Sequence, residues 1–182
     1  MASIPRFPKF HAKHGPAHDC ESVADAHRER YRGKLPDELL ELWQQDGWCG
    51  YGNGFLWTVD PETLAHVFAD DEQSTAFMRT ALGGVFYFKG KDARYLDILM
   101  GDTSVVFNRM PALFDTLLCD DEYLQDVLRH DLFQQAVSKI GKLQRDECYG
   151  FLPPLPMGGS ETDPLKRVKL REHLAIVIQA LE

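Results

Sequence analysis

The chain has 182 residues, of which 44% are hydrophobic and 26% are charged, so it suits a globular domain and is too apolar for a disordered protein. Its formal net charge of −8 argues against nucleic acid as the main partner, because that binding depends on neutralising phosphates with Lys and Arg. No stretch is long and apolar enough to span a membrane, and the N-terminus lacks the apolar middle of a secretory signal. We therefore expect a cytoplasmic protein that does not bind membranes.

Residues 1–20 are rich in Pro, His and Lys, and we expect this segment to drape over the body or to fray. A first helix is predicted to begin near Ala24. A second follows Pro36, because proline suits the first turn of a helix and the acids after it suit the helix dipole. This second helix is predicted to end at Gly47.

A glycine-rich turn is predicted over residues 48–54, followed by a short strand over residues 55–59. Asp60 and Pro61 are typical of a helix start, with the aspartate as the cap and the proline at the first position. The acids that follow Ala69 are unfavourable at the negative end of a helix dipole. The helix is therefore predicted to stop at or before that alanine.

Residues 85–88, 95–99 and 104–107 are β-type runs joined by short connections that contain glycine. Such short connections require antiparallel neighbours. The sequence thus predicts a small antiparallel sheet, and we expect the helices to pack on one face of it.

The last third of the chain is predicted to be mainly helical. Three apolar stripes follow Pro111, and the third is expected to end at Gly141. Residues 145–159 form a Pro/Gly-rich connection whose many apolar side chains indicate that it is packed. Asp163 is predicted to begin a final helix. The predicted fold class is α+β, a single compact body made of two sequence modules.

Four cysteines lie far apart, and no two of them form a CxxC pair. Without an export signal we expect reduced thiols, mostly buried, rather than a disulfide or zinc framework. The four are Cys20, Cys49, Cys119 and Cys148.

The acids are concentrated in the middle of the chain. Residues 35–78 contain nine acids and residues 110–128 contain five, and neither stretch contains Lys or Arg. A solvated surface is the simplest explanation. The sharper hypothesis is an electrostatic field that attracts a basic partner and speeds its association.

Two acidic clusters stand out within these stretches. Paired carboxylates can serve a metal or acid–base catalysis, but adjacent residues diverge on a helix, and no histidine or lysine accompanies them at a useful spacing. We interpret them as exposed acids or as a docking patch. The candidate partner-binding acids are Asp70, Asp71 and Glu72 in the first cluster and Asp120, Asp121 and Glu122 in the second.

Aromatic residues are dense between residues 43 and 57. Core packing accounts for Trp43 and Phe55. Trp48 and Tyr51 fall in the predicted turn and are expected to remain partly exposed, where aromatic side chains commonly anchor interfaces. They are added to the candidate partner-binding residues.

No catalytic residue, metal site or cofactor is predicted. The glycine-rich segment follows a helix and precedes a strand, which is the reverse of the order in a dinucleotide-binding loop. The N-terminal histidines fit no familiar zinc spacing and indicate a mobile polar terminus. Nor does the sequence contain a GxSxG, P-loop or HExxH motif. The residues of this N-terminal cluster are His11, His14, His18, Cys20 and His27.

Two stretches resemble known protein families. Residues 31–40 (YRGKLPDELL), Trp43 and residues 47–61 (GWCGYGNGFLWTVDP) resemble the GAD-like region found at the front of certain bacterial proteins. Residues 140–153 (IGKLQRDECYGFLP), followed by a glycine pair, look like the C-terminal domain of type VI secretion immunity proteins that neutralise a DNase toxin. The family's motif residues are interpreted as determinants of the fold.

The resemblance implies a non-enzymatic protein that binds a cognate secreted toxin, expected to be a basic nuclease, and covers its active or DNA-binding surface. It divides the chain into an N-terminal segment (1–20), a GAD-like region (21–108) and an immunity-type helical region (109–182). A protein-binding adaptor of the same fold and a metal-dependent hydrolase are the alternatives, and the oligomeric state is left open.

Overall fold

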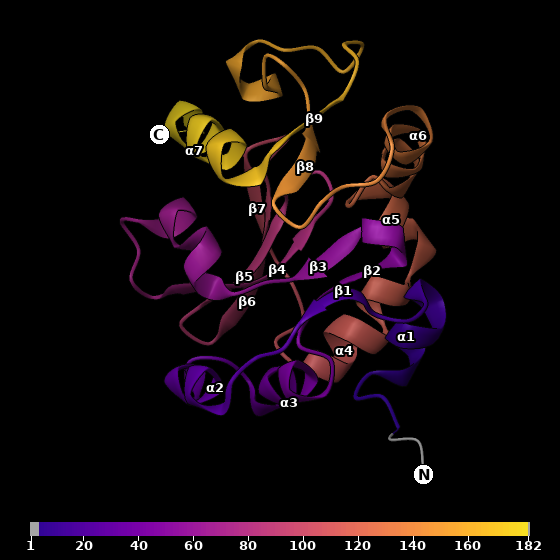
Figure 1. Ribbon diagram of the computed structural model, residues 1–182. Coiled ribbons are helices and arrows are strands. Elements are labelled where there is room, and N and C mark those ends of the chain that lie inside the picture. The colour runs from indigo at the N-terminus through magenta and orange to yellow at the C-terminus, as the bar shows by residue number, and fades with distance from the viewer. Residues whose placement is uncertain (1–3, 182) are drawn as a thin grey trace.

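A seven-stranded antiparallel sheet forms the centre of the molecule (Figure 1). The computed structural model describes residues 4–181. Along the sheet the strands keep the order of the sequence, from β1 at one edge to β7 at the other, and β8 pairs with β9 in a separate hairpin. The strands are β1 (His18–Glu21), β2 (Trp48–Tyr51), β3 (Leu56–Thr58), β4 (Ser74–Thr80), β5 (Val85–Lys89), β6 (Asp92–Asp97), β7 (Asp102–Val105), β8 (Glu147–Gly150) and β9 (Lys166–Lys169).

Helices surround this sheet. Of those within residues 4–181, none combines the length and the hydrophobicity that a membrane span needs. The α-helices are α1 (Pro8–His14), α2 (Asp25–Tyr31), α3 (Asp37–Gln45), α4 (Met110–Asp115), α5 (Asp121–Asp126), α6 (His130–Ile140) and α7 (Leu170–Leu181). The 3-10 helices are η1 (Gly52–Gly54), η2 (Pro61–Phe68), η3 (Leu117–Cys119) and η4 (Leu155–Met157).

The predicted α+β class with an antiparallel sheet is confirmed. The expectation that helices cover only one face is wrong. Four consecutive side chains of β5, Val85 to Phe88, are buried, and this requires cover on both faces because neighbouring side chains of a strand point to opposite faces. On one face Tyr51 packs against Phe10 of α1. On the other, Tyr87 packs against Phe68 of η2.

The sheet is larger than the predicted meander because β1, β2 and β4 were not expected. Trp48–Tyr51 is a buried strand and not a turn, since the positive-φ residues that reverse the chain begin only at Gly52. Asp60 does cap the following helix, where its side chain accepts from the backbone N–H of Glu62 at 3.0 Å. That helix ends at Phe68, as predicted.

The segment before residue 21 was expected either to drape over the body or to fray, and residues 4–20 lie packed on the body as a helix and an edge strand. Two phenylalanines explain this packing. Phe7 stacks on Phe114 with ring centroids 4.4 Å apart, and Phe10 lies 5.1 Å from the same ring. Burying both rings anchors α1 against α4, so residues near the start of the chain pack against the C-terminal region.

The C-terminal region contains helices where expected, and α6 ends at Gly141. The final helix, however, begins at Leu170 and not at Asp163, because Lys166–Lys169 forms a strand that pairs with β8. The prediction that residues 145–159 are packed is correct only in part: Tyr149 and Phe151 are buried, whereas Leu152 and Met157 are exposed.

A disulfide joins Cys20 and Cys49, which corrects the expectation of four reduced thiols. The two residues are distant in sequence, but pairing of β1 with β2 brings their Cα atoms to 4.2 Å. Cys148 is buried, and it and Cys119 are free thiols. Cross-strand pairing could not be foreseen, because β1 itself was not predicted.

Thiol titration tests the disulfide directly. We expect two reactive thiols in protein unfolded without reductant and four after reduction. The bond closes a loop with a sequence separation of 29 residues, so the Cys20→Ser/Cys49→Ser variant should lose about 3 kcal/mol of unfolding free energy. Four thiols in the unreduced protein would contradict the pairing.

The docking of α1 should depend on pH through His11. Its ring contacts the Asp46 carboxylate at 2.7 Å and the Phe7 carbonyl at 2.8 Å, and the side-chain bond to Asp46 is the main cause that raises the pKa of this histidine. The stabilisation from the protonated ring is therefore complete below pH 6.5 and is lost as the pH rises through the elevated pKa.

Urea unfolding of His11→Ala should accordingly show a loss of about 2 kcal/mol at pH 5.5 and a smaller loss at pH 8.5. Tyr51→Phe is the matched control, because it removes a neutral hydrogen bond to the same carboxylate, 2.9 Å long. Its loss should differ little between the two pH values. An equal loss for His11→Ala at both pH values would contradict a charged contact.

Candidate functional site

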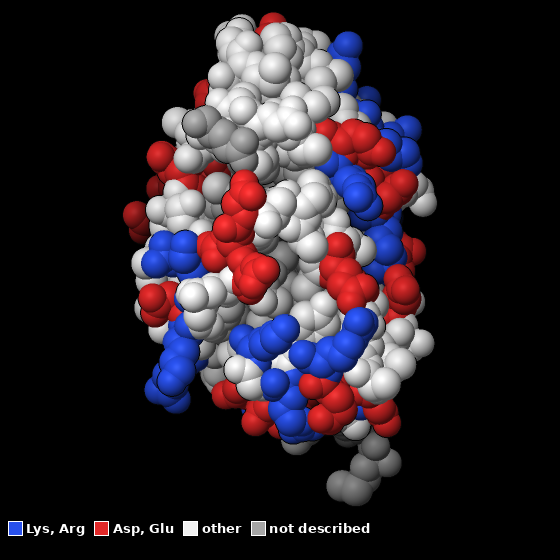
Figure 2. Space-filling view, turned by 90° about the vertical axis from the view of Figure 1, so that its left-hand side faces the viewer, with Lys and Arg blue, Asp and Glu red and all other residues white. Residues whose placement is uncertain are grey.

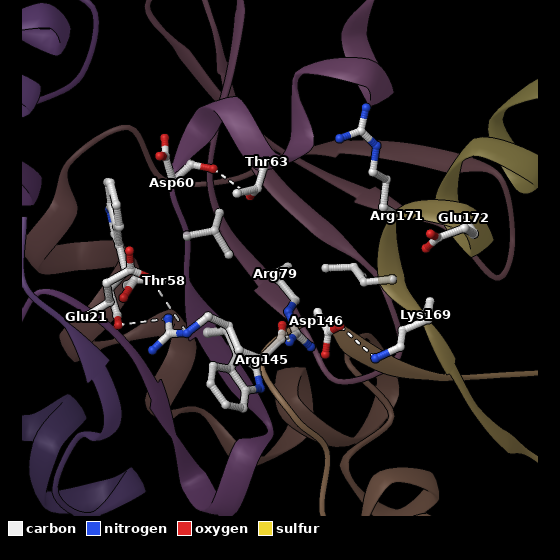
Figure 3. A pocket seen from close by; sticks show the side chains of 14 residues that line it. Glu21, Thr58, Asp60, Thr63, Arg79, Arg145, Asp146, Lys169, Arg171 and Glu172 are labelled. Carbon is white, nitrogen blue, oxygen red and sulfur yellow. Dashed lines mark hydrogen bonds and ion pairs between the residues drawn. The ribbon is translucent and has the colours of Figure 1, made fainter.

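A cavity of about 480 Å³ lies where the seven-stranded sheet meets the C-terminal hairpin (Figure 3). Strands β3 and β4 supply its floor, and η2, β9 and the start of α7 contribute walls. Both sequence modules contribute residues to its lining, so the cavity exists only when the two modules are packed together. Its charged side chains include Arg79, Arg145, Lys169, Glu21, Asp60 and Asp146.

Arg79 is the most unusual residue of this cavity. It lies on β4, is 0% exposed, and has no carboxylate oxygen within 4.0 Å among residues 4–181. Its guanidinium donates to the Arg145 carbonyl at 2.8 Å and weakly to the Thr80 carbonyl at 3.4 Å, while its buried Nε has no partner within the described part of the chain. Burial lowers the pKa of Arg79 to about 10, so the side chain stays protonated at neutral pH.

The ring of Trp57 lies beside this charge. The Arg79 guanidinium is 4.9 Å from its centroid and the Arg145 guanidinium is 5.8 Å from it. The register of the sheet explains the first contact, because Trp57 on β3 is directly opposite Arg79 on β4. An aromatic face attracts a cation, which compensates part of the cost of burying Arg79.

Arg145 connects the C-terminal region to the first two strands. Its guanidinium donates to the Trp48 carbonyl at 3.0 Å and to the Asp19 carbonyl, and its Nε lies 3.9 Å from a Glu21 oxygen. Figure 3 shows the Arg145 side chain extending toward Glu21. The residue therefore holds β1, β2 and the segment before β8 in one arrangement.

Acids lie at the edges of the cavity. Asp146 pairs with Lys169 at 2.7 Å, and Asp60 contacts His27 at 3.2 Å. The bond from Lys169 lowers the pKa of Asp146, which keeps this carboxylate ionised. Arg171 lies at the rim and has no ion pair among residues 4–181. The cavity is thus polar at its edges, with a buried cation in its floor.

The two predicted acidic clusters lie apart from each other and from this cavity. Asp70–Asp71–Glu72 follows η2 and Asp120–Asp121–Glu122 begins α5, on opposite sides of the molecule in Figure 1. Asp71 pairs with Lys89 at 2.7 Å, and this contact lowers its pKa. Asp121 pairs with Lys13, and Asp120 caps α5.

Each cluster therefore presents only part of its charge. Four cluster acids are exposed and have no ion pair within residues 4–181, namely Asp70, Glu72, Asp120 and Glu122. Figure 2 shows acidic and basic side chains interspersed on one face of the molecule, so that face does not carry a field of a single sign.

The expected exposure of two aromatic residues is wrong. Tyr51 is 0% exposed and Trp48 is 6% exposed, because both belong to β2 inside the sheet and not to a turn. Tyr51 packs between α1 and the sheet and donates to Asp46. Trp48 forms part of the cavity wall.

The N-terminal histidines have separate partners. The Nε2 atom of His14 lies 2.6 Å from the Leu118 carbonyl, and His18 contacts Asp19 at 3.0 Å. Within residues 4–181 no three His, Cys, Asp or Glu side chains are grouped so that they could hold a metal ion. Burial lowers the pKa of His14, consistent with a neutral ring at its carbonyl contact.

Sequence reasoning missed the cavity because it missed β4. One signal was present: Arg79 interrupts the otherwise apolar or small residues 76–82. A lone charge inside such a run indicates a buried cation with a special environment. Arg145 gave no such signal, since its segment is rich in charge.

In comparisons with known proteins, each half of the chain matches a protein-family model. Residues 6–101 match the family model of the GAD-like domain, and residues 110–180 match that of the T6SS immunity protein Tdi1, C-terminal. The chain is also similar to the crystal structure of Atu4351 from Agrobacterium tumefaciens, with a TM-score of 0.73 and 18% identity over 96% of this chain and 89% of that one. At this identity the likeness shows the fold alone. No curated protein matches the sequence.

The role of Arg145 can be tested by unfolding in urea. Arg145→Ala should lower the unfolding free energy by about 1–2 kcal/mol, because it removes charged hydrogen bonds to two backbone carbonyls. Arg167→Ala is the control, since this exposed arginine has one carbonyl contact and a long ion pair with Glu147 at 3.7 Å, and its loss should be about 0.5 kcal/mol. Equal losses would show that Arg145 does not hold the two regions together.

Proposed function

Because the chain belongs to the GAD-like domain family, and its C-terminal region matches the family of the T6SS immunity protein Tdi1, we propose that it is an immunity protein that binds and neutralises a cognate type VI secretion toxin. The match of residues 110–180 is the observation that carries this proposal. We propose a binding function without catalysis, exercised in the cytoplasm of the cell that makes both proteins, where the Cys20–Cys49 disulfide is an exception to the reduced state usual for thiols.

The toxin is proposed to be a basic, DNA-cleaving enzyme whose active or DNA-binding surface this chain covers. The net charge of −8 supports this, because an acidic protein is attracted to a surface built to hold phosphates. An inhibitor that must protect its own cell needs high affinity, of the order of nanomolar, or about −12 kcal/mol.

Within this proposal the exposed acids without an ion pair guide the encounter, namely Asp70, Glu72, Asp120 and Glu122. The ion-paired Asp71 and Asp121 contribute less. Trp48 and Tyr51 take a different role from the one expected. Since both rings are buried, we propose that they stabilise the sheet that presents the binding surface, rather than inserting into the toxin.

Co-expression tests the proposed function. Cells that produce the toxin encoded beside this gene should survive only when this chain is also produced at a comparable level. A catalytically inactive toxin gives the control for toxicity of expression itself. Equal killing with and without this chain would refute immunity, whatever the chemistry of the toxin.

Stopped-flow association tests the electrostatic part. Asp70→Lys/Glu72→Lys should slow toxin association about fivefold at low salt, with little effect at high salt, because screening removes long-range attraction. The double variant Asp102→Lys/Glu161→Lys changes two other exposed acids by the same charge and serves as the control. Association rates equal to wild type at low salt would reject steering by this cluster.

A further inference from the structure

We propose that the cavity between the GAD-like sheet and the C-terminal hairpin binds a carboxylate carried on an apolar stem, with Arg79 as the counter-charge. The carboxylate comes either from an acidic side chain or chain terminus of the partner protein or from a free organic acid. The proposal concerns a site on this chain and does not require the toxin to be a nuclease.

The buried guanidinium of Arg79 is the first argument. An arginine carries five N–H donors, and the described residues accept two contacts from it, one of them 3.4 Å long. Its Nε is buried without a partner, and no carboxylate of residues 4–181 lies within 4.0 Å. A buried charge is costly unless it is paired, which suits this side chain to an anion. Because Arg79 is 0% exposed, such an anion must displace the side chains that cover the guanidinium in order to reach it.

The walls of the cavity are the second argument. Trp57 and Trp48 contribute aromatic surface, and Val59 and Leu170 contribute aliphatic surface. A volume of about 480 Å³ is within the range of small-molecule sites and admits an amino-acid side chain or a small aromatic acid. Of the four basic residues that line the cavity only Arg79 is fully buried, and the apolar walls around it favour a ligand with a single charged end.

The charged side chains of the lining select among anions. Glu21, Asp60, Asp146 and Glu172 border the cavity together with four basic residues, Arg79, Arg145, Lys169 and Arg171. The lining is therefore balanced in charge and does not favour a multiply charged phosphate or a nucleic-acid backbone. A carboxylate has one charge and two oxygens whose spacing matches the fork of a guanidinium. The cavity therefore favours a carboxylate over phosphate.

A purely structural role for Arg79 is the competing explanation. Its bond to the Arg145 carbonyl joins the two modules, and this bond alone could account for its presence. The two explanations differ in what the cavity binds, and binding can be measured on the intact chain.

Phenylacetate is the probe, and phenylacetamide is the neutral control of the same shape. Ligand-observed NMR at neutral pH should detect saturable binding of phenylacetate with a Kd of the order of 1 mM, and binding of the amide should be at least tenfold weaker. Equal binding of acid and amide, or no binding of either, would overturn the proposal.

Variants assign the binding to this cavity. Arg79→Met should abolish phenylacetate binding and Arg79→Lys should weaken it about tenfold, because lysine keeps the charge and loses the fork. Arg167→Met removes an exposed arginine elsewhere and should leave binding unchanged. If circular dichroism shows that the Arg79 variants do not fold, the Val59→Phe variant provides the test. The larger side chain narrows the cavity and should weaken phenylacetate binding. Wild-type affinity for phenylacetate in this variant would show that the ligand binds elsewhere.

Competition separates the two sources of the carboxylate. If the toxin supplies it, phenylacetate raises the apparent Kd of the toxin complex, and Arg79→Met or Val59→Phe raises the Kd directly. If phenylacetate binds without affecting the complex, the site takes a free organic acid. Survival in co-expression is measured separately, so failure of the immunity function and failure of this site are distinguishable.

Discussion

The buried charge of Arg79 is the constraint around which the two modules are arranged. A cation without an ion pair among residues 4–181 is tolerated at the centre of a sheet only where other groups compensate for lost water. The Trp57 ring and the Arg145 carbonyl provide this compensation, and they come from different family regions. The Tyr149 N–H donates to the carbonyl of Ala81, the residue that follows the end of β4, at 2.8 Å, and this bond is a second link between the two regions. The modules thus share polar contacts as well as apolar packing.

This arrangement bears on function because a protein that blocks another by binding needs a rigid surface. Rigidity reduces the entropy lost on association and thereby favours a long-lived complex. Contacts of α1 with α4 and of Arg145 with β1 and β2 hold elements that are far apart in sequence. The acids at the surface are less organised, since lysines neutralise one member of each cluster. In the proposed complex, the surface charge would then act mainly on the rate of association with the partner. The shape of the two-module body would determine how long the complex lasts.

The sequence predicted those elements whose ends are determined by nearby residues. The η2 start at Asp60–Pro61, the end of α6 at Gly141 and the β5–β7 meander follow from caps, glycines and short connections, and all were found. β1, β4 and β9 were missed because strands are stabilised by partners distant in sequence, and a short polar segment such as Lys166–Lys169 carries no periodic signal of its own. The cavity could not be predicted without β4, and the disulfide could not be predicted without β1. The family resemblance depended on long sequence motifs and therefore did not require the strands.

Native-state hydrogen exchange tests most directly whether the two modules form one cooperative body. The amide of Tyr149 donates to Ala81, and the amide of Ala81 donates to the Phe55 carbonyl, so one bond crosses between the modules and the other lies within the first. If the account is right, both amides exchange only through global unfolding, with the same opening free energy and the same dependence on denaturant. A Tyr149 amide that opens several kcal/mol more easily than Ala81 would show a C-terminal region that unfolds by itself, and would contradict a binding surface and a cavity that depend on the joined modules.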